Sequence, residues 1–110
     1  MKTFFLFTSS LLLLNTPAVF AQSNQEAALL ASQSGCMACH KVEGKLVGPG
    51  YQDVAEKYKG QPDSLEQLSQ KVKKGGAGSW GRIPMPAHPQ LSDESARVLV
   101  TWILKGAPSQ

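Results

Sequence analysis

Apolar residues recur every three or four positions in four segments of this chain, the spacing that predicts amphipathic helices. The first two segments are residues 25–34 and 51–58. The last two, each counted from its N-cap residue, are residues 63–74 and 92–105. No segment shows the apolar–polar alternation of a half-buried strand. The pattern therefore predicts an all-α fold of about four short helices joined by long loops.

Capping residues set the expected helix boundaries. Asp63, followed by Glu66 three positions later, matches the capping box, in which both side chains bond to backbone N–H groups at the helix start. Ser92 is also a good N-cap, and the two acidic residues after it suit the positive end of the helix dipole. Gly35 is expected to end the first helix, and the Gly- and Pro-rich residues 75–90 are expected to lack regular structure.

Residues 1–21 have the features of a cleaved signal peptide. Lys2 gives a positive start, residues 4–14 are mostly apolar, and small residues precede Gln22. An uncleaved membrane anchor is the alternative, but the interruptions at residues 8–10 and 15–17 leave an apolar run shorter than the roughly 20 residues that a bilayer requires. We therefore expect export, and a single mature domain over residues 22–110.

The composition describes a small domain whose core needs reinforcement. The chain has 110 residues and a formal net charge of +3. Its basic residues are scattered and its aromatic residues are few, which argues against nucleic-acid binding. A domain of this size buries only about 60–65% of its unfolded surface, so its core is marginal. A large apolar cofactor tied to the chain would supply the missing core.

The strongest chemical signal is the run Cys-Met-Ala-Cys-His at residues 36–40. Two thiols spaced i and i+3 on a helical turn face the same way, so Cys36 and Cys39 can both add to the vinyl groups on one side of a haem. His40 follows directly, where an imidazole nitrogen can bind the iron. The motif therefore predicts one covalently bound haem c, with Cys36 and Cys39 as thioethers and His40 as an axial ligand.

A redox dithiol, a disulfide and a zinc site are the other interpretations of the two cysteines. A thioredoxin-like dithiol requires a βαβ context, which the sequence does not suggest. A plain disulfide would leave the adjacent His40 unexplained. A zinc site needs four ligands, whereas the chain has only two Cys and two His, and Cys39 and His40 are neighbours.

The second axial position of the iron is filled by a protein ligand in an electron carrier and is left open in a haem that binds or converts a substrate. Met85 is the expected ligand, because Met1 leaves with the signal peptide and Met37 lies inside the attachment loop. Prolines at 84, 86 and 89 restrict the backbone around Met85 and reduce the entropy lost when its loop closes over the haem. His88 is the competing ligand; its simpler interpretation is a partly exposed loop residue.

Taken together, these motifs resemble the small bacterial class I cytochromes c, specifically the cytochrome c-551 group. The resemblance spans residues 25–105 and rests on residues 35–40, 47–49 and 80–86 and on the final helix around Trp102. It implies the class I cytochrome c fold. The chain departs from the group after Met85, where Pro-Ala-His-Pro replaces the usual Pro-Pro-Asn, so this segment lacks the Asn that would help to orient the ligating sulfur.

The resemblance also implies a haem environment. The Pro49 carbonyl would accept the free N–H of His40 and orient its ring. Trp80 would donate its indole N–H to a haem propionate, and Lys71 would lie near the propionates. Simple packing for Trp80 and a solvated surface charge for Lys71 are the alternatives.

These observations predict a periplasmic monohaem cytochrome c, a soluble, monomeric one-electron carrier between respiratory-chain donors and terminal reductases or oxidases, and not an enzyme. The resemblance suggests redox partners such as a nitrite reductase, a haem-copper oxidase, a cytochrome c peroxidase or a quinol-oxidising complex. A ligand-binding or catalytic haem protein and a permanently docked subunit are the alternatives. Seven lysines are candidates for a docking surface for an acidic partner, with a solvated surface as the alternative: Lys41, Lys45, Lys57, Lys59, Lys73, Lys74 and Lys105.

Overall fold

The computed structural model of the chain describes residues 23–109, so the predicted signal peptide lies outside the described residues. Four α-helices and one turn of 3₁₀-helix form this part of the chain: α1 (Asn24–Gln33), η1 (Cys36–Ala38), α2 (Tyr51–Lys57), α3 (Ser64–Lys74) and α4 (Asp93–Leu104). Within residues 23–109 there is no strand, only an isolated antiparallel bridge between Gly76 and Met85. The predicted all-α fold is confirmed, and each predicted helix is present with ends close to those expected.

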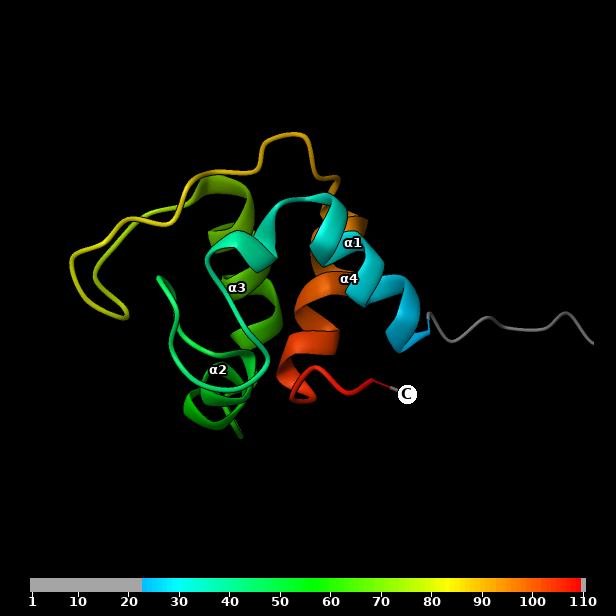
Figure 1. Ribbon diagram of the computed structural model, residues 1–110, viewed down its shortest axis with the longest axis horizontal. Coiled ribbons are helices and arrows are strands. Elements are labelled where there is room, and N and C mark those ends of the chain that lie inside the picture. The colour runs from blue at the N-terminus through cyan, green and yellow to red at the C-terminus, as the bar shows by residue number, and fades with distance from the viewer. Residues whose placement is uncertain (1–22, 110) are drawn as a thin grey trace, which may run out of the picture.

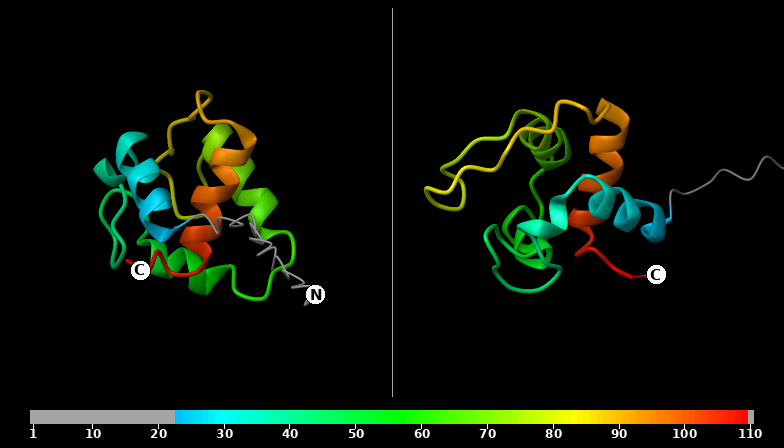
Figure 2. Two further views of the ribbon diagram at one scale, coloured as in Figure 1. Left: turned by 90° about the vertical axis from the view of Figure 1, so that its right-hand side faces the viewer. Right: turned by 45° about the horizontal axis from the view of Figure 1, so that its top comes forward.

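Helix α4 is the centre of the packing. It contacts α1, α2 and α3, and Figures 1 and 2 show α1 lying across it while α2 and α3 lie on its other side. Leu99 and Val100 are its most deeply buried large side chains, and Trp102 and Ile103 are buried beside them. None of the helices between residues 23 and 109 is both long enough and apolar enough to cross a membrane.

The helix caps agree with the sequence at one predicted position and disagree at another. The Ser92 side chain accepts a hydrogen bond from the Ser95 N–H, as predicted for the start of α4. The capping box at Asp63 was wrong: Asp63 has φ −93° and ψ 3°, and its side chain makes no capping bond. A capping side chain needs extended backbone, which this turn lacks. The Glu66 carboxylate instead pairs with Arg97 of α4.

A second ion pair between α3 and α4 and a tight turn shape the connection between these helices. Lys73, near the end of α3, pairs with Asp93 at the start of α4, and this contact lowers the pKa of the Asp93 carboxyl. Gly75 then ends α3 with φ 69°. A Cβ at Gly75 would lie 2.5 Å from the Met85 carbonyl oxygen, so only glycine allows the loop to return this close. The yellow loop in Figure 1 is the segment that leaves and returns here.

Candidate functional site

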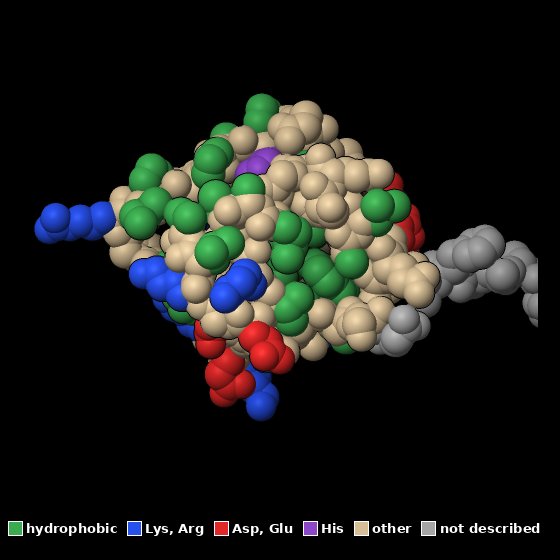
Figure 3. Space-filling view, in the orientation of Figure 1, with side chains coloured by type: hydrophobic (Ala, Val, Ile, Leu, Met, Phe, Trp, Pro, Cys, Tyr) green, Lys and Arg blue, Asp and Glu red, His purple; other side chains and the backbone are tan. Residues whose placement is uncertain are grey.

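An apolar cavity of about 520 Å³ opens beside α3 and α4. Its size falls within the range of about 300–1,000 Å³ that is typical of cofactor and small-molecule sites. Leu68 and Val72 of α3 and Leu99, Val100 and Ile103 of α4 line it. In Figure 3 apolar side chains gather on the face of Figure 1, while lysines and arginines lie toward its left and lower parts. The cavity therefore suits a large apolar ligand.

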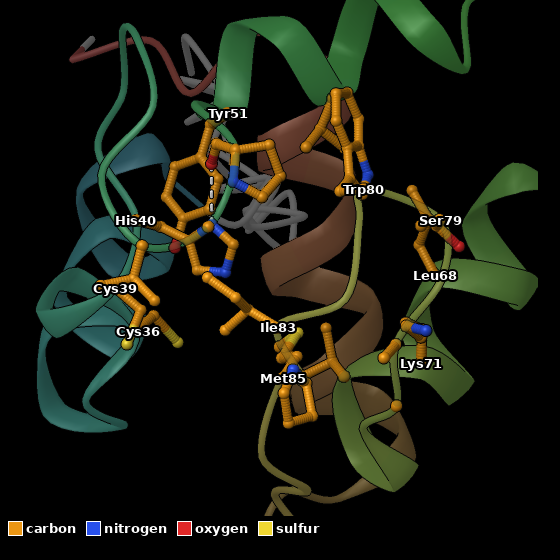
Figure 4. A pocket seen from close by; sticks show the side chains of 18 of the residues that line it. Cys36, Cys39, His40, Tyr51, Leu68, Lys71, Ser79, Trp80, Ile83 and Met85 are labelled. Atoms are coloured by element: carbon orange, nitrogen blue, oxygen red, sulfur yellow. Dashed lines mark hydrogen bonds between the residues drawn. The ribbon is translucent and has the colours of Figure 1, made fainter.

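Cys36, Cys39 and His40 lie together on one wall of this cavity (Figure 4). Gly35 adopts a left-handed conformation with φ 77°, which ends α1 and starts η1. The backbone N–H groups of Cys39 and His40 both donate to the Cys36 carbonyl oxygen, at 3.2 and 3.0 Å. This tight turn presents both sulfurs and the imidazole from a single short segment.

Both thiols are free. Cys36 is buried and Cys39 is half-buried, and burial raises the pKa of the Cys36 thiol. The structure therefore supplies two unlinked, neighbouring thiols that face an apolar cavity. This arrangement is what covalent attachment of a haem requires.

The imidazole of His40 is held in one tautomer. Its Nδ1 lies 2.8 Å from the Pro49 carbonyl oxygen, the contact that the resemblance implied. A carbonyl oxygen only accepts, so Nδ1 carries the proton and Nε2 has the free lone pair. Within residues 23–109, the structure records no hydrogen bond to Nε2. The free lone pair of Nε2 is therefore available to bind a metal.

Tyr51 stacks on the imidazole ring of His40, a role that sequence reasoning missed. The His40 and Tyr51 rings stack at 5.3 Å with an interplanar angle of 19°, and Tyr51 packs edge-on against Trp102 at 5.6 Å. Tyr51 is only 3% exposed, and burial keeps the pKa of its phenol well above the usual range. The sequence placed Tyr51 at the start of a helix, and nothing in that pattern points to His40.

Gly48 is a second missed residue. A Cβ at this position would lie 2.5 Å from Cε1 and 2.9 Å from Nδ1 of His40, closer than real Cβ contacts. Its backbone N–H also donates to the Cys39 carbonyl oxygen at 2.7 Å. The Gly-Pro pair at residues 48–49 could be read from the sequence as part of the family pattern, but the close approach is visible only in three dimensions.

Met85 lies across the cavity from Cys36, Cys39 and His40 (Figure 4). Its backbone is fixed by two hydrogen bonds to Gly76: Met85 N donates to Gly76 O at 2.9 Å, and Gly76 N donates to Met85 O at 3.0 Å. The side chain is partly buried and packs against the core. Met85 is thus a neutral thioether on the far wall, at the closed base of its loop.

His88, the competing ligand, is placed elsewhere. Its backbone N–H donates to the Val72 and Lys73 carbonyl oxygens at the end of α3, and its Nδ1 donates to the Val72 oxygen at 3.2 Å. His88 does not line the cavity. The structure therefore assigns this imidazole to the end of α3, where it satisfies helix carbonyls.

Trp80 and Lys71 both line the cavity, as the resemblance implied. Trp80 is 42% exposed. Lys71 is half-buried. The ammonium of Lys57, on α2, lies 4.3 Å from the centre of the Trp80 ring.

The residues present fit a haem and do not fit a zinc site. Two free thiols, an imidazole lone pair, a thioether, an apolar lining and a lysine at the edge form a complete donor set for a covalently bound haem. Between residues 23 and 109, no group of three or more His, Cys, Asp and Glu could hold a metal ion, which argues against the zinc interpretation. The same part of the chain has no strands to support a thioredoxin-like dithiol.

Comparison with known proteins agrees with the haem-binding interpretation of this site. The cytochrome c family model matches residues 25–107. Cytochrome c-552 of Hydrogenobacter thermophilus is 54% identical over 75 residues, covering 68% of this chain and 76% of that protein. Cytochrome c-552 of Nitrosomonas europaea is 43% identical over 106 residues, covering 94% and 97%. The crystal structure of the wild-type Nitrosomonas europaea protein superposes with a TM-score of 0.69 at 46% identity, covering 72% of this chain and 98% of that one.

Proposed function

This chain belongs to the cytochrome c family, as a small class I member of the c-551 type, and we propose that it shuttles single electrons in the periplasm between respiratory-chain donors and terminal reductases or oxidases. Its family membership establishes a small monohaem electron carrier with one covalently bound haem c, rather than an enzyme. The periplasmic location, the partners and the role of each site residue are the proposal.

The observation that carries the assignment of ligands is the pairing of His40 and Met85 across one cavity. The Pro49 carbonyl accepts the Nδ1 proton of His40, so the Nε2 lone pair is free and would bind the iron of a haem in the cavity; the bridge to Gly76 holds the backbone of Met85, whose sulfur would be the second iron ligand. Cys36 and Cys39 would form the two thioethers. If both His40 and Met85 bind the iron, no coordination position would remain for a substrate.

The iron of the bound haem gains and loses one electron, and the protein's own part is to hold and shield it. Leu99 and Val100, the most deeply buried large side chains, form part of the cavity lining and keep water from that wall. A thioether on the iron and an apolar surrounding both favour the ferrous state, which raises the reduction potential. Lys71 and Trp80 would meet the propionates at the cavity edge.

Export to the periplasm rests on residues 1–21, which have the charged start, apolar stretch and small residues of a signal peptide. We expect the mature protein to begin near Gln22 and to work there as a soluble monomer. Partners of the kinds that the resemblance suggests are a nitrite reductase, a haem-copper oxidase, a cytochrome c peroxidase or a quinol-oxidising complex. The scattered lysines would steer an acidic partner if they act as a docking surface.

Two measurements on the protein from its native host test this proposal. A potentiometric titration should fit one reversible one-electron couple with a slope of about 59 mV per tenfold change in the oxidised-to-reduced ratio. Osmotic-shock fractionation should release the haem-bound protein with the periplasmic contents. A titration that needs two couples contradicts the single-electron carrier, and recovery with the cytoplasm contradicts the location.

A further inference from the structure

Lys57 makes a contact that no part of the site described so far requires. It stands in the last turn of α2, and its ammonium donates a hydrogen bond to the Ser79 carbonyl oxygen at 2.6 Å. The same ammonium lies 4.3 Å from the centre of the Trp80 ring. One lysine therefore makes a hydrogen bond and a cation–π contact to two successive residues of the loop that ends at Met85.

The loop has few other attachments. Its base is closed by the two hydrogen bonds between Gly76 and Met85, and an internal bond from Gly78 N to Gly81 O, at 2.9 Å, closes its tip. Among the described residues, the bond from Lys57 is the one hydrogen bond that joins residues 77–84 to the rest of the chain. These loop residues are exposed, so packing alone does not fix them.

The backbone of the loop is also permissive. Gly76, Gly78 and Gly81 all have φ between 107° and 128°, conformations in which glycine has no side-chain constraint. A glycine-rich loop that is tied only at its base can open about that base at low cost. A second anchor near its tip removes most of this freedom. In Figure 4 the Trp80 indole lies beside α2, the helix that carries Lys57.

We propose that Lys57 is a positioning residue for Met85: it pins the tip of the 77–84 loop to α2 and thereby slows the departure of the Met85 sulfur from the iron. This inference rests on the proposed role of Met85 as the axial ligand. Lys57 has no recorded contact with His40 or Met85 and does not itself line the cavity, so its effect passes through Ser79, Trp80 and the loop backbone. The same contact holds the Trp80 ring at the cavity edge.

The test measures how fast a neutral ligand replaces Met85 in the ferric holoprotein. Imidazole at about pH 8 is neutral, so the removal of a surface charge does not change its local concentration. With a methionine ligand in place, the observed rate should level off at high imidazole concentration, and the plateau reports the rate at which the sulfur leaves the iron. The ferric iron–sulfur absorption band follows the same event.

Three variants separate the proposed role from general charge and packing effects. K57M keeps most of the apolar stem and removes the cation, and its plateau rate should rise about fivefold, the factor that one exposed cation–π contact supports. K57R keeps a cation that can bond to the carbonyl and stack on Trp80, and it should restore the rate to within about twofold of wild type. K59M removes a neighbouring lysine that has no side-chain hydrogen bond or ion pair in the described part of the chain, and its rate should match wild type.

The possible failures are distinguishable. If the wild-type rate levels off but K57M matches it, or if K59M accelerates the reaction as much as K57M, Lys57 does not position the loop and the axial role of Met85 still stands. If the wild-type rate rises with imidazole concentration without a plateau and the iron–sulfur band is absent, Met85 is not the ligand and the proposed function fails first.

Discussion

His40 donates its Nδ1 proton to the Pro49 carbonyl oxygen, 2.8 Å away, and this one bond determines which imidazole nitrogen is free. The neighbouring Gly48 leaves no room beside the ring, and Tyr51 stacks on it. The orientation of His40 is thus determined by one hydrogen bond and two close contacts. A change at any of the three should be seen at the iron.

Gly48→Ala should disturb His40 without removing any chemical group. The new Cβ would lie 2.5 Å from the imidazole Cε1, so the ring or the backbone must move. Overpacking of this kind costs about 1–3 kcal/mol, which lowers the thermal midpoint of a domain this size by about 5–20 °C. Thermal unfolding of the holoprotein, followed at the haem absorption, measures the shift.

Leu46→Ala is the matched control for that variant. Leu46 lies two positions before Gly48, is 47% exposed and does not line the cavity, so its truncation should change the midpoint by no more than a surface substitution does. Equal midpoints for Gly48→Ala and wild type would show that the His40 loop can adapt, and would remove Gly48 from the positioning of the ring.

The sequence predicted the elements of this fold well because their signals are local. Apolar spacing and the Ser92 cap act within one or two turns of a helix, and the structure has them where expected. The capping box at Asp63 was wrong because the backbone at Asp63 is not extended and because Glu66 pairs with Arg97, which is 31 residues away along the chain. A local motif contains no information about such a distant partner.

The candidate site could be predicted only in part for the same reason. Cys36, Cys39 and His40 are adjacent in the sequence, and proline restriction marked Met85. The stacking of Tyr51 on His40 and the reach of Lys57 to Ser79 both depend on how α2 packs, so no spacing rule could find them. For His88, the sequence allowed a role that the structure does not favour. Its position in the loop made it a competing iron ligand, whereas its imidazole bonds to the Val72 carbonyl oxygen.

Covalent attachment should survive conditions that extract a free haem. The intact mass of the protein after acid-organic extraction should still include one haem, because thioether bonds through Cys36 and Cys39 resist this treatment. Cys36→Ala and Cys39→Ala should each lower the haem yield sharply, since each removes one of the two free thiols. A chain that loses its haem in the extraction has no thioether bonds.

Folding should depend on the haem. The cavity of about 520 Å³ lies against α3 and α4, so the haem-free chain lacks the apolar mass that their inner faces contact. A domain this small has a marginal hydrophobic core, so we expect the apoprotein to be largely unfolded. Far-ultraviolet circular dichroism of the apoprotein during heating measures this, and a cooperative transition from native-like helicity would contradict it.

Trp80→Phe should raise the reduction potential modestly, by tens of millivolts at most. A hydrogen bond from the indole N–H to a propionate stabilises its negative charge, and that charge favours ferric iron; phenylalanine keeps most of the bulk and loses the donor. The ring would also remain near the Lys57 ammonium, so the loop should stay in place. Voltammetry of both proteins at one pH measures the change, and an unchanged potential would assign Trp80 to packing alone.

Mixing the ferrous protein with carbon monoxide tests the central claim most directly. If Met85 and His40 both bind the iron, wild type should not take up carbon monoxide on simple mixing, and His88→Ala should behave in the same way because His88 bonds to the end of α3. Met85→Ala should bind carbon monoxide readily, since it opens the cavity wall opposite His40. Rapid uptake of carbon monoxide by the wild-type protein would contradict the account and indicate a ligand-binding or catalytic haem instead.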